Sequence, residues 1–100
     1  MENNNLEREY SFDYSDEYPL HIALHKKSGQ KKNLDKIATF INEISIHPKM
    51  GTGHPEPLKG YEQRNVYSRR IDKKHRLIYE IFEEEKRVEL LSAWGHYDDK

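Results

Sequence analysis

Three segments with the residue pattern of β-strands follow one another in the second half of the chain. They span residues 65–71, 75–82 and 88–97, and two short polar stretches, 72–74 and 83–86, lie between them. Connections of this length join antiparallel neighbours, because a parallel crossover needs a dozen residues or more. The segments therefore predict an antiparallel sheet against which the rest of the chain must pack.

The first half of the chain predicts one more strand and two helices. Residues 10–14 alternate aromatic and polar side chains, as in a half-buried strand. Ser15 is a suitable N-cap for a helix that ends near Gly29 and has as its apolar residues Leu20, Ile22, Ala23 and Leu24. A second helix has an apolar stripe at helical spacing, made of Leu34, Ile37, Ala38, Ile41 and Ile44. We therefore expect an α+β fold, with two N-terminal helices packed on a mostly antiparallel, roughly four-stranded twisted sheet.

Length and composition predict one domain. One hundred residues suffice for a single core, which we expect in residues 10–100 after a flexible polar tail at 1–9. The absence of cysteine excludes disulfides, thiolate zinc sites and a cysteine nucleophile. No stretch approaches the roughly 20 apolar residues of a membrane span, and the polar N-terminus has no apolar signal region. These features are typical of a cytoplasmic protein that makes no membrane contact.

The net charge of −1 hides a strongly basic segment. Residues 59–76 contain seven Lys or Arg and only two acidic residues, whereas the rest of the chain is acidic. Phosphate binding depends on the local potential more than on the sum of all charges. Because charge runs are also common on ordinary solvated surfaces, this segment alone leaves both interpretations open.

A set of side chains in the second half has the chemistry needed to cleave RNA without a metal or other cofactor. RNA carries its own nucleophile, the 2′-OH, so an enzyme needs a base for that proton, cations for the phosphate and an acid for the leaving oxygen. Glu56, between two prolines, is the candidate base, and His96 is the candidate acid because imidazole titrates near neutrality. The candidate phosphate-binding cations are Arg76, Arg70, Arg69 and Lys59, and the groups that could orient or stack on the substrate are Tyr97 and Trp94.

Strand alternation supports part of this grouping. If Tyr67 and Ile71 join the apolar residues of 75–82 in the core, Arg70 and Arg76 both point to the opposite face. Along 88–97, His96 shares a face with Trp94, Ser92 and Leu90, and it could meet the two arginines across the sheet. A structural role for the same residues stays open, in which Glu56 only pairs with a basic neighbour and His96 is an exposed terminal residue.

Other sites are less favoured by the sequence. His21 and His25 are four residues apart on the first helix and could hold a metal, but the glutamate of a metalloprotease motif is missing between them. We interpret them as two exposed helical histidines. Ser68 and Ser92 have no evident base and orienting partner, so a serine triad is not supported.

Three ordered motifs resemble the YoeB/Txe group of type II toxins, within the RelE superfamily of ribosome-dependent mRNA endonucleases. They are GTGHPEPLKG, VYSRRIDKKHRLIYE and the C-terminal GHY, and the resemblance covers roughly residues 10–97. It implies a compact RelE-like toxin that cleaves mRNA in the ribosomal A site and is neutralised by a cognate antitoxin, with a homodimer left open. By motif position it implies Glu56 as base, Arg76 as transition-state stabiliser, His96 as acid and Tyr97 as substrate-positioning residue, with Arg70 and Lys59 on phosphate.

The sequence also departs from that group. A polar tail precedes Tyr10, Asp98, Asp99 and Lys100 follow the His-Tyr pair, and Trp94 stands where related sequences often have a basic residue. The added acids would raise the pKa of His96 and compete with phosphate. A non-catalytic module of the same fold, which binds RNA, the ribosome or a protein, is therefore the alternative function.

Overall fold

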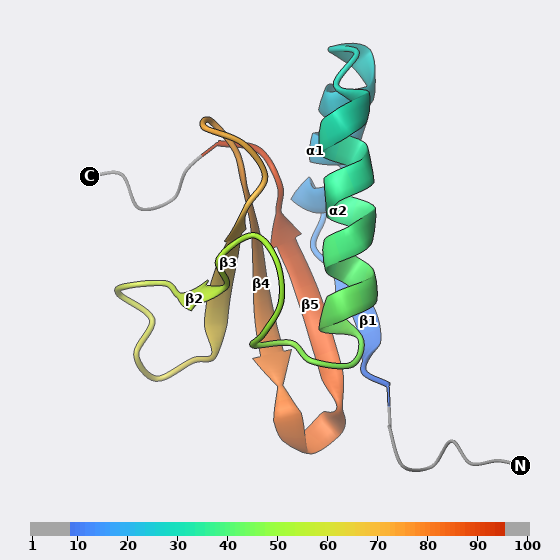
Figure 1. Cartoon of the computed structure of the whole chain (residues 1–100). Coiled ribbons are helices and arrows are strands. Elements are labelled where there is room, and N and C mark those ends of the chain that lie inside the picture. Colours follow the sequence, from blue (N-terminus) through green and yellow to red (C-terminus); the bar gives the residue numbers. More distant parts are fainter. Residues whose placement is uncertain (1–8, 96–100) are drawn as a thin grey trace, which may run out of the picture.

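The computed structural model describes residues 9–95 and consists of two helices beside a five-stranded sheet (Figure 1). In chain order the elements are β1 (Ser11–Tyr14), α1 (Glu17–Lys27), α2 (Lys31–Ile44), β2 (Glu56–Pro57), β3 (Val66–Arg70), β4 (Arg76–Phe82), a 3₁₀ turn (Glu83–Glu85) and β5 (Arg87–Ser92). The α+β class and the two N-terminal helices are confirmed. The expected tail at 1–9 lies outside the described residues except for its last residue, and so do residues 96 and 97.

The sheet has the strand order β1-β5-β4-β3-β2. The neighbours β5, β4 and β3 are antiparallel, as the short turns predict. β2 also pairs antiparallel with β3, whereas β1 pairs with β5 in parallel. The fifth strand is β2, a two-residue segment in the loop that we expected to be irregular. The sheet is therefore mixed, and it is one strand wider than the sequence predicts.

The main core lies between the helices and one face of the sheet. Its members are buried apolar side chains from both layers, among them Ile37, Phe40, Ile44, Ile71, Leu77, Tyr79, Ile81, Val88 and Leu90. A small second cluster, formed by Leu58, Val66 and Ile78, covers part of the other face. Within residues 9–95 no helix covers that other face, so it is open for a functional site (Figure 1).

Two details of helix packing differ from the sequence prediction. In α1 the side chains of Leu20 and Leu24 are exposed, whereas Tyr18 and His25 are buried. In α2 Phe40 is buried and Ala38 is exposed, although the rest of the predicted stripe packs inward as expected. Residues 9–95 contain no helix that is long and apolar enough to cross a membrane.

A bulge breaks the alternation of β5 near its end. Tyr79 of β4 pairs with Leu90, but Ile78 pairs with Ser92, so one residue of β5 is inserted between these pairs. Paired residues share a face, and Ser92 therefore lies on the face of Ile78 and not on that of Leu90. The prediction that Leu90, Ser92 and Trp94 share one face is wrong, and β5 ends at Ser92 instead of continuing to residue 97.

Gly53 is expected to be a position where even alanine is poorly tolerated. Its φ is +81°, and a Cβ there would lie 2.6 Å from the Phe40 ring. Gly53→Ala should therefore lower the free energy of unfolding by more than the about 1–2 kcal/mol that a left-handed conformation alone costs. The matched control is Gly60→Ala, because Gly60 has a φ of +92° but open space around it. Urea denaturation of both variants measures the difference, and equal losses would contradict the steric argument.

Candidate active site

The candidate general base lies at the edge of the sheet. Glu56 is the first residue of β2 and pairs with Ser68 of β3, and its side chain is 62% exposed. Pro55 and Pro57 restrict the backbone on either side of it. The carboxylate is thus carried by a short paired strand and not by a free loop, which gives it a defined position next to β3.

Two arginines lie beside this carboxylate on the same face. Arg70 and Arg76 are directly opposite each other in the β3–β4 ladder, and Arg70 and Ser68 share a face because they are two residues apart. Since Glu56 pairs with Ser68, all of these residues belong to the face that no described helix covers. The prediction that Arg70 and Arg76 point away from the core together is therefore confirmed by the register.

Arg76 and Glu56 form the central pair of the site. Arg76 Nη1 is 3.7 Å from Glu56 Oε2 and 3.3 Å from the Ser68 hydroxyl, to which it donates. The Arg76 side chain is only 13% exposed, and its Nε is buried with no hydrogen-bond partner in residues 9–95. A guanidinium has five N–H donors, and a buried donor without an acceptor is unfavourable by about 1–3 kcal/mol. An anion at the exposed part of this guanidinium would be a further acceptor for its terminal N–H donors.

This arrangement can bind a phosphate and remove a proton next to it. The 3.7 Å separation leaves the Glu56 oxygen attracted to Arg76 but not tied up by a short hydrogen bond. Lys59 is exposed and lines the same groove as Glu56, where it can act as a supplementary point charge. A carboxylate, a partly buried guanidinium and further cations on one open face suit general-base chemistry on a phosphodiester.

Arg69 is not available to a substrate, although the sequence suggests it as a phosphate contact. Its side chain is 0% exposed and faces the helices. The guanidinium donates to Glu43 Oε1 at 2.6 Å, to the Tyr79 hydroxyl at 3.0 Å and to the Met50 carbonyl at 2.7 Å, with further carbonyl contacts in the loop 47–52. We correct its role to that of a structural residue that joins α2, β4 and this loop.

The pKa values of Glu43 and Tyr79, which both bind Arg69, are shifted from their usual values. Burial alone would raise the pKa of Glu43, but hydrogen bonds from the Thr52 N–H and hydroxyl, together with Arg69, outweigh it and hold that pKa below its usual value. Burial also raises the pKa of Tyr79, and Arg69 offsets only part of this effect. The carboxylate of Glu43 therefore stays ionised, and the phenol of Tyr79 stays neutral.

The basic segment offers less positive charge to a ligand than its sequence suggests. Besides Arg69, Arg64 is engaged by Glu80, with two hydrogen bonds of 3.1 and 2.7 Å. Arg69 and Arg64 are therefore held by carboxylates outside the candidate site, Glu43 and Glu80. Electrostatic attraction of phosphate then depends more strongly on Arg70, Arg76 and Lys59.

The two histidines of α1 have a structural role that the sequence does not predict, because both bind the backbone of Ala93. His25 is 0% exposed, and its Nε2–H donates to the Ala93 carbonyl at 2.8 Å, so the interpretation as two exposed histidines is wrong. His21 Nδ1 accepts from the Ala93 N–H at 3.0 Å. Burial lowers the pKa of His21, an effect that Glu17 opposes and His25 reinforces. Within residues 9–95 no group of three His, Asp or Glu residues has the arrangement of a metal site.

Trp94 lies in a different environment from Glu56. Its ring is 4.8 Å from that of His25 and 4.2 Å from that of His75, measured between centroids. It lines a cavity with His75 and the turn 72–74, separate from the groove of Glu56. His96 and Tyr97, the predicted acid and substrate-positioning residue, lie outside the described residues.

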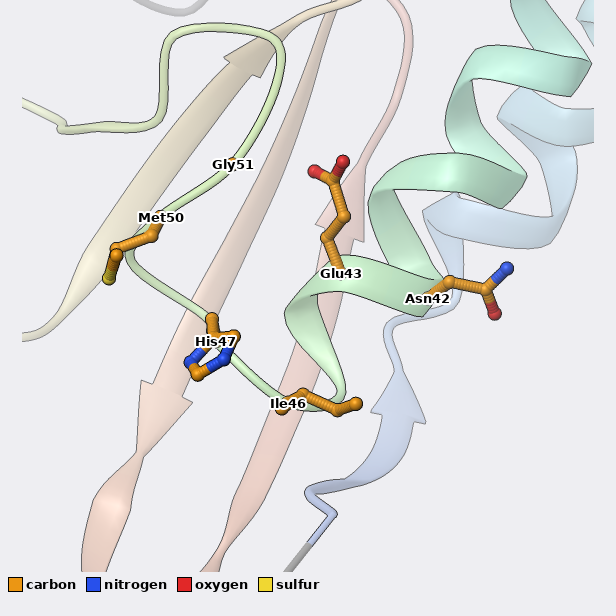
Figure 2. Close-up of a pocket in the computed structure, with 6 residues that line it drawn as sticks. All are labelled: Asn42, Glu43, Ile46, His47, Met50 and Gly51. Carbon is orange, nitrogen blue, oxygen red and sulfur yellow. The ribbon is translucent and has the colours of Figure 1, made fainter. Parts of the chain in front are cut away.

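A further cavity lies between the end of α2 and the loop that follows it. Its lining residues are Asn42, Glu43, Ile46, His47, Met50 and Gly51 (Figure 2). None of them is a predicted site residue, and the carboxylate of Glu43 is already bound to Arg69 and Thr52. The cavity therefore adds no group to the candidate active site.

Comparisons with known proteins agree on one family. The family model for the YoeB-like toxin of bacterial type II toxin-antitoxin systems matches residues 19–97. Toxin RelK of Mycobacterium tuberculosis is 41% identical over 70 residues, which are 70% of this chain and 79% of that protein. The structure of the YoeB dimer from Staphylococcus aureus has a TM-score of 0.76 at 27% identity and covers 89% of this chain and 99% of its own. A YoeB–YefM complex from the same organism contains a chain with a TM-score of 0.64 at 28% identity, which covers 88% of this chain and 98% of its own.

Proposed function

Because the chain belongs to the YoeB-like toxin family of bacterial type II toxin-antitoxin systems, we propose that it is an endoribonuclease that cleaves mRNA on the ribosome and thereby inhibits translation. The observation that carries the proposal is the Glu56–Arg76 pair, 3.7 Å apart on the open face of the sheet. In this proposal the reaction takes place in the A site and needs no metal or other cofactor.

The proposed reaction is a transesterification within the RNA strand. Glu56 accepts the proton of the 2′-OH, and the 2′-oxygen attacks the neighbouring phosphorus. Arg76, aided by Arg70 and Lys59, neutralises the charge that develops on the non-bridging oxygens. The bond to the 5′-oxygen breaks as that oxygen takes a proton, which we assign to His96, while Tyr97 helps to place the substrate. The products are a 2′,3′-cyclic phosphate, which can open to a 3′ phosphate, and a 5′-hydroxyl end.

The assemblies of related proteins indicate which partners to propose for this chain. The S. aureus relatives include a YoeB–YefM complex and a YoeB dimer, and we propose that this chain likewise has a cognate antitoxin and can form a homodimer. Its other partners in the proposal are the ribosome and mRNA in the bacterial cytoplasm.

The proposal predicts which mRNA atom is essential. Ribosomes programmed with an mRNA that has a single 2′-deoxynucleotide on the 5′ side of the cleaved bond should show no cleavage at that bond, because the nucleophile is missing. The all-ribose mRNA is the control, and end analysis should find a 2′,3′-cyclic or 3′ phosphate and a 5′-hydroxyl. Cleavage at the deoxy position would contradict the mechanism. Inhibited translation with intact all-ribose mRNA would instead support the non-catalytic binding module.

A further inference from the structure

Three histidine side chains hold the backbone that follows β5. The N–H of Ala93 donates to His21 Nδ1 at 3.0 Å, and the carbonyl of Ala93 accepts from His25 Nε2 at 2.8 Å. The N–H of Gly95 donates to His75 Nδ1 at 2.9 Å. Imidazoles thus replace the strand partner that this backbone lacks, and we call His21, His25 and His75 the histidine clamp.

The clamp is built into the fold from separate elements. His21 and His25 are four residues apart on α1 and therefore share one face of the helix. His75 comes from the turn between β3 and β4, where its own N–H donates to Asp72 Oδ1 at 2.8 Å. Asp72 in turn accepts from the Asn33 side chain of α2 at 3.1 Å. The clamp therefore fixes the end of β5 relative to both helices.

Two rings of the clamp, those of His25 and His75, are also packed against each other. The centroids of His25 and His75 are 5.0 Å apart, and Trp94 contacts both rings. His25 Nδ1 is buried without a partner in residues 9–95, so this ring carries its proton on Nε2, where it donates to Ala93. Side chains held this firmly leave the attached backbone little freedom.

The clamped segment joins two parts of the proposed active site. The Gly95 carbonyl accepts from the N–H of Arg76 at 3.1 Å, which places the end of the clamped backbone beside the residue that carries the phosphate-binding guanidinium. Gly95 is followed directly by His96 and Tyr97. Any constraint on Ala93 and Gly95 is therefore a constraint on the point from which the proposed acid extends.

We propose that the histidine clamp consists of positioning residues, which orient the His96–Tyr97 pair for catalysis by fixing the backbone of Ala93 and Gly95. This inference rests on the proposed endoribonuclease function. The clamp does not touch RNA. It fixes the backbone from which His96 and Tyr97 extend, a contribution that should change the turnover rate and hardly the substrate affinity.

The test uses pairs of variants that differ in one hydrogen-bond acceptor. His75→Leu removes the acceptor for Gly95, whereas His75→Asn places an amide oxygen near the position of Nδ1. His21→Leu and His21→Asn form the same pair for the Ala93 N–H. We expect each leucine variant to lower kcat for ribosome-bound mRNA by about 10- to 100-fold with KM little changed, and each asparagine variant to recover most of the loss. His47→Leu is the control, because His47 is an exposed histidine outside the site.

Amide hydrogen exchange on the isolated protein separates this inference from the function on which it rests. Exchange of the Gly95 amide should accelerate at least about tenfold in His75→Leu, and amides of β4 should stay protected if the variant is folded. A folded leucine variant with wild-type kcat, or a Gly95 amide that exchanges freely in the wild type, would overturn the clamp while the endoribonuclease function stands. Wild-type protein that cleaves no mRNA would overturn the function and, with it, the positioning role, even if the Gly95 amide is protected.

Discussion

Arg76→Ala is expected to reduce cleavage of ribosome-bound mRNA by about 10²- to 10³-fold, the loss that follows removal of a single preorganised donor to a developing negative charge. The expectation rests on the placement of Arg76. Its guanidinium is largely buried, lies 3.7 Å from Glu56 and has a buried Nε that no described residue binds. Arg76→Lys should recover only part of the activity, because an ammonium lacks the planar pair of N–H donors with which a guanidinium binds two phosphate oxygens at once.

The Glu56 variant should show a related but distinguishable defect. Glu56→Gln keeps the shape of the side chain and removes the base, so cleavage should fall by about 10²- to 10⁴-fold. If both residues act on the same transition state, the double variant should lose less than the sum of the two single effects, expressed as activation free energies. Single-turnover cleavage by saturating protein measures all three variants.

Arg87→Ala is the matched control for Arg76→Ala. Arg87 is also partly buried and ion-paired, with Asp13 at 3.2 Å, but it pairs with Phe82 at the other end of β4. Its loss should leave the cleavage rate unchanged. An equal loss in the Arg76 and Arg87 variants would mean that cleavage follows general ribosome affinity, and the assignment of Arg76 to the transition state would then be wrong.

Strand alternation in the sequence predicts which side chains of β3 and β4 face the site and which face the core. The short turn 72–74 makes β3 and β4 antiparallel neighbours, and Leu77, Tyr79 and Ile81 identify the face that is buried. Once that face is known, Arg70 and Arg76 must lie on the other one. The outward orientation of both arginines therefore follows from the sequence alone, and the register confirms it.

Other parts of the site depend on contacts that periodicity does not encode. Spacing puts His21 and His25 on one helix face, but it cannot tell that this face meets the end of β5 while Leu20, 64% exposed, points outward. The pairing of β2 involves only two residues, too few for a strand pattern. The inserted residue in β5 likewise changes the face of Ser92 with no sign in the sequence.

Arg69 shows how two adjacent arginines acquire unrelated roles. Alternation puts Arg69 on the core face with Tyr79, whereas Arg70 faces outward. The sequence feature that indicates a core position for Arg69 is its spacing of two residues from Tyr67 and from Ile71, both of which are expected in the core. Its positive charge suggested phosphate binding instead, and the partner that neutralises it, Glu43, is far away in sequence on α2.

Arg69→Ala is expected to lower the free energy of unfolding by about 3–5 kcal/mol, the usual loss when one partner of a buried ion pair is removed. The substitution leaves the Tyr79 hydroxyl and the Met50 carbonyl without the donor that they bind, and it opens a cavity under the loop 47–52. Because small domains have only about 5–15 kcal/mol in total, the variant should unfold at a much lower urea concentration.

Arg70→Ala is the matched control in the same strand. Arg70 is exposed, so its loss should change the free energy of unfolding by no more than about 0.5 kcal/mol while it weakens cleavage. The two variants should therefore separate stability from activity, since Arg69→Ala affects the first and Arg70→Ala the second. Urea denaturation and single-turnover cleavage of the folded fraction measure both properties. If Arg69→Ala unfolds at the same urea concentration as Arg70→Ala, the network around Arg69 does not stabilise the fold, and its removal from the substrate-binding set would have to be reconsidered.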